Sequence, residues 1–248
     1  MKKEKVIVAS NEKVALDIYK IVLETSISKI AKAGQFIDIN IGDKAHLLRR
    51  PISISEVNGK FLTLYYKVVG FGTNKMSLLK KGEMLEILGP LGNGFPLVSK
   101  KSVLIIGGGI GIAPLLELAK NLSFENTITI VLGYQSKNQI YLEKELKKYG
   151  KVIITTDDGS SGFKGNPLDY IKKNNIDFET VYACGPLVML KALDKTYKDK
   201  KQGFLSFEAR MGCGVGICYG CAIKTTKGNV RVCHEGPVFE LGEVIYES

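Results

Sequence analysis

The first hundred residues alternate between short apolar runs and turn-forming residues. The runs occupy residues 6–9, 14–23, 35–41, 51–57, 61–69 and 84–88, and Asn58 and Gly59 separate two of them. An Asn-Gly pair between two strand-like runs is typical of a β-hairpin. Six short strands in succession predict a small antiparallel barrel. One short helix is expected within this region, at residues 73–79.

The pattern changes after residue 98. An apolar run at residues 103–106 ends in three consecutive glycines, and a helical stretch follows at residues 112–121. Further strands are expected at residues 127–132, 152–155, 180–184 and 204–207, and helices at residues 141–148, 167–174 and 186–197. Such strict alternation is typical of a doubly wound parallel sheet with helices on both faces. We therefore predict a multidomain β plus α/β protein, with a barrel at residues 1–98, a nucleotide-binding sheet at residues 99–207 and a small C-terminal domain at residues 208–248.

Composition and charge narrow the function classes. The chain has 248 residues, of which 45% are hydrophobic and 24% charged, which excludes disorder as the main state. No apolar run is long enough to span a bilayer and no signal peptide is visible, so we expect a cytoplasmic protein with no membrane partner. The net charge is +10, but the lysines are scattered without interleaved aromatic residues. We therefore expect no nucleic-acid partner.

Four of the five cysteines fall close together near the C-terminus. Cys213, Cys218, Cys221 and Cys233 follow the spacing C-x4-C-x2-C-x11-C, whereas Cys184 stands apart. In a reducing compartment such a group indicates a metal or an iron–sulfur cluster before disulfides. The opening C-x4-C-x2-C matches plant-type [2Fe–2S] ligands, and the glycines between them let backbone amides point at the sulfurs. Four cysteines also satisfy structural zinc, so both metals stay open at this point.

A strand-to-helix turn is the second candidate site. Its glycines, Gly107, Gly108, Gly109 and Gly111, would let a diphosphate approach the backbone at a helix N-terminus. The spacing does not fit the dinucleotide fingerprint G-x-G-x-x-G, and a tight turn without a ligand is the alternative.

A second glycine-marked strand end is expected at the same edge of the sheet, at Cys184, Gly185 and Pro186. Ligands of open parallel sheets bind at the carboxyl ends of the strands, so the two turns should flank one crevice. Cys184 would either touch a nicotinamide ring there or be a small buried residue.

The barrel offers a weaker pair of motifs. Arg50, Pro51, Ile52 and Ser53 form the first; arginine suits phosphate binding, and the serine can hydrogen-bond a ring heteroatom. The second contains Gly72 and Thr73 at the start of the short helix, which is another candidate diphosphate cradle.

Together these motifs resemble the ferredoxin-reductase superfamily, and more closely the family of electron-transfer subunits of type B dihydroorotate dehydrogenases. The resemblance covers essentially the whole chain and includes the residues after the last cysteine, Gly236 to Phe239. It implies FAD in the barrel, NAD(H) on the second domain and one [2Fe–2S] cluster on the four C-terminal cysteines. The implied FAD contacts are Arg50, Pro51, Ile52, Ser53, Tyr65, Tyr66, Lys67, Gly72 and Thr73. The implied NAD(H) contacts are Gly107, Gly108, Gly109, Gly111, Cys184, Gly185 and Pro186.

Two of these positions depart from the pattern. Ile52 stands where the superfamily often has an aromatic residue that stacks on the flavin. Lys67 stands where an arginine is common in the closer family.

The same resemblance implies a partner and a reaction. The partner is the FMN-containing catalytic subunit of dihydroorotate dehydrogenase, in a heterotetramer of two of each chain that serves pyrimidine biosynthesis. The expected reaction passes a hydride between NAD(H) and FAD and single electrons through the cluster to FMN, in either direction. We find no acid–base group suited to orotate itself, in agreement with a chain that carries electrons and leaves dihydroorotate to its partner.

Some alternatives remain open on the residues alone. NAD is favoured over NADP, although residues 133–137 after the second strand hold neither an acidic residue for a ribose hydroxyl nor an arginine for a phosphate. Ser136 and Lys137 could accept a phosphate. The runner-up function is the flavin subunit of an NAD(P)H:ferredoxin reductase or a soluble hydrogenase. A zinc-stabilised nucleotide-binding module is the less favoured reading.

Overall fold

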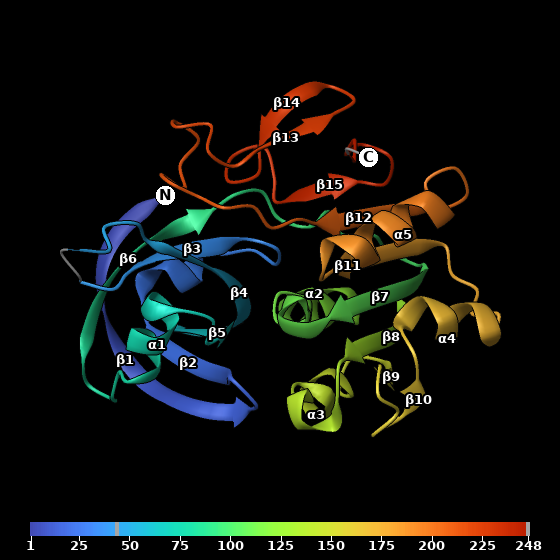
Figure 1. Ribbon diagram of the computed structural model, residues 1–248, viewed down its shortest axis with the longest axis horizontal. Helices are drawn as coiled ribbons and strands as arrows, with labels where there is room; N and C mark the ends of the chain where they lie inside the picture. Colours follow the sequence, from blue (N-terminus) through green and yellow to red (C-terminus); the bar gives the residue numbers. More distant parts are fainter. Residues whose placement is uncertain (43–44, 247–248) are drawn as a thin grey trace.

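The computed structural model describes residues 1–42 and 45–246. Figure 1 shows a barrel on one side, an open sheet on the other and a C-terminal segment that lies over both. This arrangement confirms the predicted fold class, with an antiparallel barrel, a parallel sheet and a small cysteine-containing tail.

Six antiparallel strands close the barrel in the order β1-β2-β5-β4-β3-β6. They are β1 (Lys2–Ala15), β2 (Ile18–Glu24), β3 (Phe36–Asn40), β4 (Arg50–Asn58), β5 (Phe61–Lys67) and β6 (Met84–Leu91). A 3-10 turn, η1 (Ser26–Lys29), follows β2, and a helix, α1 (Phe71–Ser77), follows β5. The predicted hairpin at Asn58 is confirmed, because Asn58 pairs with Phe61 across a two-residue turn.

The predicted break at residues 10–13 is wrong. Strand β1 runs without interruption for 14 residues, and the chain turns at Leu16 and Asp17 instead. The polar residues that suggested a loop lie within the strand, where Asn11 donates hydrogen bonds to the carbonyl oxygens of Met76 (2.9 Å) and Leu79 (3.0 Å). Asp17 has a φ of 57°, a left-handed conformation that short polar residues tolerate in turns.

The second sheet has the order β10-β9-β8-β7-β11-β12-β15 and is parallel except for β15. Its strands are β7 (Ser102–Gly108), β8 (Thr127–Tyr134), β9 (Lys151–Thr156), β10 (Phe163–Lys164), β11 (Thr180–Cys184), β12 (Gln202–Ser206) and β15 (Val238–Glu240). The strand order reverses between β7 and β11, so ligands are expected at the carboxyl ends of these two strands.

Helices cover both faces of this sheet. The buried residues of α2 (Leu115–Leu122) and α3 (Glu143–Leu146) join one apolar core, and those of α4 (Pro167–Lys173) and α5 (Leu187–Tyr197) join another. Two 3-10 turns, η2 (Gly109–Ile112) and η3 (Lys137–Gln139), complete the connections. Helix α3 is shorter than the predicted residues 141–148, because Leu142 adopts a left-handed φ of 62° and the helix begins after it.

The C-terminal segment is built into both other parts. It contains a hairpin, β13 (Ala222–Thr225) and β14 (Gly228–Arg231), and then adds β15 antiparallel to β12, a pairing that we did not predict. At the end of the barrel, Asn93 donates to the carbonyl oxygens of Glu235 and Val238, both at 2.9 Å, and accepts from the Val238 amide at 3.0 Å. The tail is therefore fixed to the barrel as well as to the sheet.

Helix α2 joins the sheet to the barrel (Figure 1). Ser55 Oγ on β4 donates to the carbonyl oxygen of Ala113 at 2.6 Å. The backbone of Val57 donates to Glu117 Oε2 at 2.9 Å and accepts from Lys120 Nζ at 2.8 Å. These contacts hold the barrel at a fixed position beside the glycine turn that precedes α2.

Candidate functional site

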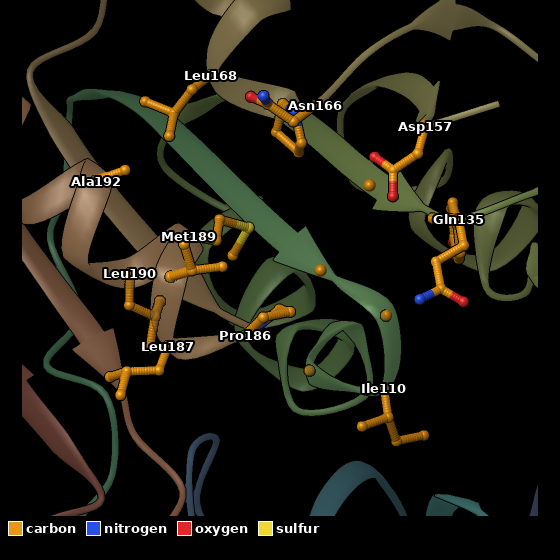
Figure 2. Close-up of a pocket in the computed structure, with 18 of the residues that line it drawn as sticks. Ile110, Gln135, Asp157, Asn166, Leu168, Pro186, Leu187, Met189, Leu190 and Ala192 are labelled. Carbon is orange, nitrogen blue, oxygen red and sulfur yellow. The ribbon is translucent and has the colours of Figure 1, made fainter. Parts of the chain in front are cut away.

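A crevice of about 710 Å³ lies at the reversal point of the sheet (Figure 2). The glycine turn after β7 and the turn after β11 line it together, which confirms the predicted crevice between two glycine-marked strand ends. Lys67 of the barrel also lines it, so the crevice opens between the two parts of the chain. Its other lining residues include Gly133, Tyr134, Gln135, Gln139, Asp157, Asn166, Leu187, Val188, Met189, Phe207 and Glu208.

The two glycine turns approach each other too closely for side chains. A Cβ on Gly111 would lie 2.6 Å from the Cα and the N of Gly185. A Cβ on Gly108 would lie 2.8 Å from Pro186 Cδ, whereas one on Gly109 would meet no atom within 4 Å. Gly109 instead needs glycine for its φ of 54°. The backbone itself therefore forms the wall of the crevice, as diphosphate binding requires.

Cys184 lies behind this wall. Its side chain is 3% exposed, and the lining of the crevice begins at the next residue, Gly185. Burial, together with the nearby Glu208 carboxylate, raises the pKa of the Cys184 thiol to about 12. The thiol is therefore protonated at neutral pH and is a neutral group beneath the turn.

Two acidic residues of the crevice were missed by sequence reasoning. Asp157 follows β9, and Figure 2 shows it near Gln135 at one end of the crevice, away from Leu187 and Leu190. Thr156 at the end of the third strand pairs in parallel with Tyr134 at the end of the second, so the residue after each strand reaches the same edge of the sheet. Glu208 is the second residue after β12 and also lines the crevice. The available signal was an acidic residue directly after a strand of a parallel sheet.

In the barrel, the two predicted motifs meet. The guanidinium of Arg50 lies against Gly72, where any Cβ would collide with it. Thr73 Oγ1 accepts from the amides of Val69 (3.0 Å) and Gly70 (3.3 Å), which orders the start of α1. The Arg50 guanidinium donates to the carbonyl oxygen of Leu48 and forms no ion pair with a carboxylate of the described residues.

The remaining barrel candidates lie on different faces. Pro51, Ile52 and Ser53 are half-buried on β4, where they pair with β3. Tyr65 is 5% exposed and packs toward the sheet, whereas the Tyr66 ring lies in the barrel core and its hydroxyl donates to Asn11 Oδ1 at 3.0 Å. Lys67 and the Arg50 motif therefore lie toward open space, while Tyr66 does not.

Apolar side chains are exposed around this barrel site. Leu47, Val69 and Leu78 are 82%, 78% and 70% exposed, and the rings of His46 and Phe71 stack 3.9 Å apart. A hollow of about 500 Å³ beside α1 is lined by Val68, Gly70, Phe71, Asn74, Lys75 and Leu78. Exposed apolar surface gathered around a hollow is typical of a binding site for a ligand with planar rings.

The four C-terminal cysteines form two pairs. The backbone amide of Cys218 donates to Cys213 Sγ at 3.4 Å, and the backbone amide of Cys233 donates to Cys221 Sγ at 3.4 Å. Within residues 1–42 and 45–246, no three Cys, His, Asp or Glu side chains converge to hold a single metal ion. Two pairs of thiols suit a cluster of two irons, whereas tetrahedral zinc needs all four sulfurs around one point.

Backbone amides point at every one of these sulfurs. Cys213 Sγ accepts from residues 215, 217 and 218 at 3.3–3.5 Å, and Cys233 Sγ accepts from Gly216 at 3.2 Å. Cys218 Sγ and Cys221 Sγ each accept one amide at 3.4 Å. Gly214 and Gly216 allow this winding through φ angles of 68° and 82°. Amide donors of this kind stabilise the negative charge of a bound cluster.

Burial and the amide hydrogen bonds give the thiols of this loop different pKa values. Burial raises the pKa of the Cys213 thiol, but the three amides outweigh it and lower the pKa to about 6. Burial, together with the adjacent Cys221 thiol, raises the pKa of the Cys233 thiol to about 12. Cys213 and Cys218 form the more exposed pair, and Cys221 and Cys233 the buried one.

A buried carboxyl group supports this loop from the barrel side. Asp38 on β3 is 2% exposed, and its carboxylate lies where any Cβ on Gly214 would be. Burial raises the pKa of Asp38 to about 6, although the nearby Arg49 lowers it. No local sequence pattern marks Asp38 as buried, because the tail that covers it is distant in sequence.

This architecture places the chain among the oxidoreductases of the ferredoxin-reductase class. A structure of an NADH-dependent reduced ferredoxin-NADP oxidoreductase superposes with a TM-score of 0.89 at 29% identity, over 97% of this chain and 90% of that chain. A ferredoxin NADP+ reductase from Neisseria gonorrhoeae with bound FAD and NADP shares the fold at a TM-score of 0.69 and 16% identity, over 82% of this chain and 93% of the other.

Sequence comparisons identify the family. Residues 208–245 match the iron–sulfur cluster binding domain of dihydroorotate dehydrogenase B, and residues 105–195 match the oxidoreductase NAD-binding domain. The electron transfer subunits of dihydroorotate dehydrogenase B (NAD(+)) from Streptococcus pneumoniae strain R6 and Fusobacterium nucleatum are each 42% identical to this chain. The alignments cover 96% of both chains in the first case and 100% of both in the second. The chain therefore belongs to the family of electron transfer subunits of dihydroorotate dehydrogenase B.

This result confirms the predicted family and its cofactor classes, and favours iron–sulfur over zinc. A family defined as an electron transfer subunit implies a catalytic partner subunit. In the described part of the chain, no helix is long and apolar enough to cross a membrane.

Proposed function

We propose that this chain carries electrons between NAD(H) and the FMN-containing catalytic subunit of a dihydroorotate dehydrogenase, through FAD and a [2Fe–2S] cluster. The observation that carries the proposal is the grouping of the four cysteines in a loop whose backbone amides point at all four sulfurs. A cluster held in this way transfers electrons singly and supplies no acid or base for orotate.

The crevice supports NAD(H) as the two-electron donor or acceptor. Its backbone wall at Gly108, Gly109 and Gly111 would hold the diphosphate, and the turn at Gly185 and Pro186 would hold the end near the flavin. Asp157 lies at the opposite end, where its carboxylate would accept a hydrogen bond from a ribose hydroxyl and disfavour a 2′-phosphate. This choice of NAD agrees with the family to which the chain belongs.

The barrel supports FAD. Arg50 and the Gly72 turn would hold the diphosphate of the flavin nucleotide, and Ser53, Tyr65 and Lys67 would lie beside its ring. The exposed apolar side chains around α1 would be covered by such a ligand. When bound, FAD accepts two electrons as a hydride and releases them one at a time, which links a nicotinamide to a one-electron cluster.

The state of the cysteines agrees with this arrangement. None of the five cysteines forms a disulfide, as expected in a reducing compartment, and we place the reaction in the cytoplasm. The proposed assembly is a heterotetramer of two electron transfer and two catalytic subunits, and we place its activity in pyrimidine biosynthesis. Tyr66 and Cys184 stay predicted cofactor contacts; their burial favours a supporting role beneath the cofactors.

A second candidate is supported by one observation. The structural likeness to an NADH-dependent ferredoxin-NADP oxidoreductase, at a TM-score of 0.89, fits a chain that passes electrons to a ferredoxin. The cofactors would be the same, and the accepting partner would differ.

The test is a pair of measurements on anaerobically purified full-length chain. A visible spectrum recorded before and after NADH should show a flavin band and a broad iron–sulfur shoulder, both bleached by NADH. The chain mixed with the catalytic subunit should then reduce orotate with NADH, whereas the chain alone should not. Ferredoxin reduction without orotate reduction would select the second candidate, and a colourless protein containing zinc would contradict both.

A further inference from the structure

Tyr141 occupies an unusual place behind the glycine turn. Its side chain is 5% exposed and does not line the crevice. Its hydroxyl lies 3.2 Å from the carbonyl oxygen of Gly109 and 3.1 Å from that of Ile110. One proton donor is therefore shared by two successive carbonyl groups of the turn.

The direction of these contacts has a consequence for the other side of the turn. In a trans peptide, the carbonyl group and the following N–H point in opposite directions. Because the Gly109 and Ile110 carbonyls face Tyr141, the amides of Ile110 and Gly111 face away from it. Both residues line the crevice, so these amides are directed toward it.

Tyr141 is itself held on several sides. Its ring lies 5.4 Å from that of Tyr65 on barrel strand β5, and its carbonyl oxygen accepts from the Tyr134 hydroxyl at 2.6 Å. The preceding segment is tied to the barrel, because the Leu16 amide donates to the carbonyl oxygen of Asn138 at 2.9 Å. Burial keeps the pKa of the Tyr141 hydroxyl well above its ordinary value, so it remains a donor across the physiological range.

We propose that Tyr141 is a positioning residue for NAD(H), whose hydroxyl holds the glycine turn with the amides of Ile110 and Gly111 facing the diphosphate. This inference rests on the proposed role of the turn as the diphosphate site. Without the hydroxyl, the turn keeps its glycines but loses the group that orients two of its peptides. The loss falls on the affinity for the nucleotide, because preorganised amides bind an anion without first being ordered.

The test uses Tyr141→Phe in the full-length chain carrying FAD and cluster, because phenylalanine keeps the ring against Tyr65. The matched control is Tyr182→Phe, which removes the hydroxyl of another buried tyrosine in the same core. That hydroxyl donates to the carbonyl oxygen of Pro96 at 2.7 Å. The readouts are the KM for NADH and the kcat with ferricyanide, the Kd for NAD+ and for ADP-ribose by calorimetry, and the flavin midpoint potential.

In Tyr141→Phe, the KM for NADH and both Kd values should rise about five- to tenfold. The kcat at saturating NADH and the flavin potential should stay at the wild-type values, and Tyr182→Phe should change none of these. Unchanged affinities in Tyr141→Phe would overturn the inference. An equal decrease of kcat and of bound flavin in both variants would also overturn it, because that result indicates a purely structural role. Failure of the wild-type chain to bind NAD+ would instead overturn the proposed function.

Discussion

The chain contains two glycine-rich loops that use their backbones in opposite directions. In the turn after β7, two carbonyl groups face inward to Tyr141 and the neighbouring amides face the crevice. In the cysteine loop, the amides face inward to the sulfurs of the four C-terminal cysteines. The first loop leaves its donors free for a ligand that comes and goes. The second loop uses its amide donors to bind the sulfur ligands of a permanently bound group.

The difference shows what glycine does and does not determine. Glycine lets a backbone approach another group closely, and both loops need it for positive φ angles, as at Gly109 and Gly216. The group approached is decided by side chains outside the glycine pattern: a tyrosine hydroxyl behind one loop, and cysteine sulfurs inside the other. Removing one member of each set should therefore affect the two loops separately.

The largest effect is expected from Cys213→Ser. Its sulfur accepts three of the amides in the loop, and a serine oxygen is a poor substitute for a thiolate ligand of iron. We expect nearly complete loss of cluster iron and of electron transfer to the catalytic subunit, while NADH still reduces ferricyanide through the flavin. Iron analysis and visible spectra measure this. Cys184→Ser is the control and should keep its iron; full iron content in Cys213→Ser would contradict the proposed ligand set.

Gly111→Ala should affect the other loop next most strongly. The added methyl group would lie 2.6 Å from the backbone of Gly185, and overpacking of this kind costs about 1–3 kcal/mol. We expect the KM for NADH to rise at least about tenfold because the diphosphate wall is displaced. The iron content should not change.

Gly109→Ala is its matched partner, since a methyl group there meets no atom and costs only the strain of a left-handed φ, about 1 kcal/mol. Steady-state kinetics and thermal unfolding measure both variants. Equal KM values in the two would show that the close approach to Gly185 is unrelated to nucleotide binding.

Asp157→Ser tests which nucleotide, NAD(H) or NADP(H), binds in the crevice beside the first loop. The carboxylate at the far end of the crevice should favour a ribose hydroxyl and repel a phosphate, so its removal should raise the ratio of kcat/KM for NADPH to that for NADH about tenfold. Asp158→Ser is the control, because Asp158 does not line the crevice and its carboxylate accepts hydrogen bonds from Ser160. An equal change in both variants would point to net charge alone.

The smallest effect concerns the barrel residue beneath the second loop. Asp38 has a folded-state pKa of about 6, above its unfolded value of 3.8, so its protonated form favours folding. This contribution is complete below pH 3.8 and is lost as the pH rises through 6. From pH 5 to 7.5, the wild-type chain should therefore lose about 1 kcal/mol of stability that Asp38→Asn keeps.

Thermal unfolding at the two pH values measures this difference, with Asp199→Asn as an exposed control. A difference between Asp38→Asn and the wild type that is independent of pH would show that the carboxyl group does not titrate in this range.

These residues also mark how far sequence alone could reach. The cysteine set and the glycine turns were predictable, because their spacing is local and their chemistry follows from residue type. Asp157, Tyr141 and Asp38 were not, since each acts on a segment far from it in sequence. Asp157 reaches the crevice only because β9 lies parallel to β8, and Asp38 is buried only because the tail folds back over β3.

Local sequence pattern also gave wrong secondary structure where tertiary contacts determine the conformation. The gap between the apolar runs at residues 10–13 predicted a loop, yet Asn11 donates to carbonyl groups at the C-terminal end of α1 and the strand continues through it. No sequence pattern predicted strand β15. The strand has only three residues, and they are extended because they pair with β12.

Strand β15 also means that the cluster-binding segment is not an interchangeable module. Residues 208–245 match a family of domains, but β15 within them pairs with β12, and the Phe207 amide donates to the Pro237 carbonyl oxygen at 2.9 Å. Cutting the chain at residue 208 would leave the edge of β12 unpaired and prone to aggregation. A cluster fixed in this way cannot swing between donor and acceptor like a tethered carrier. A fusion that moves it to another reductase would have to bring the matching sheet edge with it.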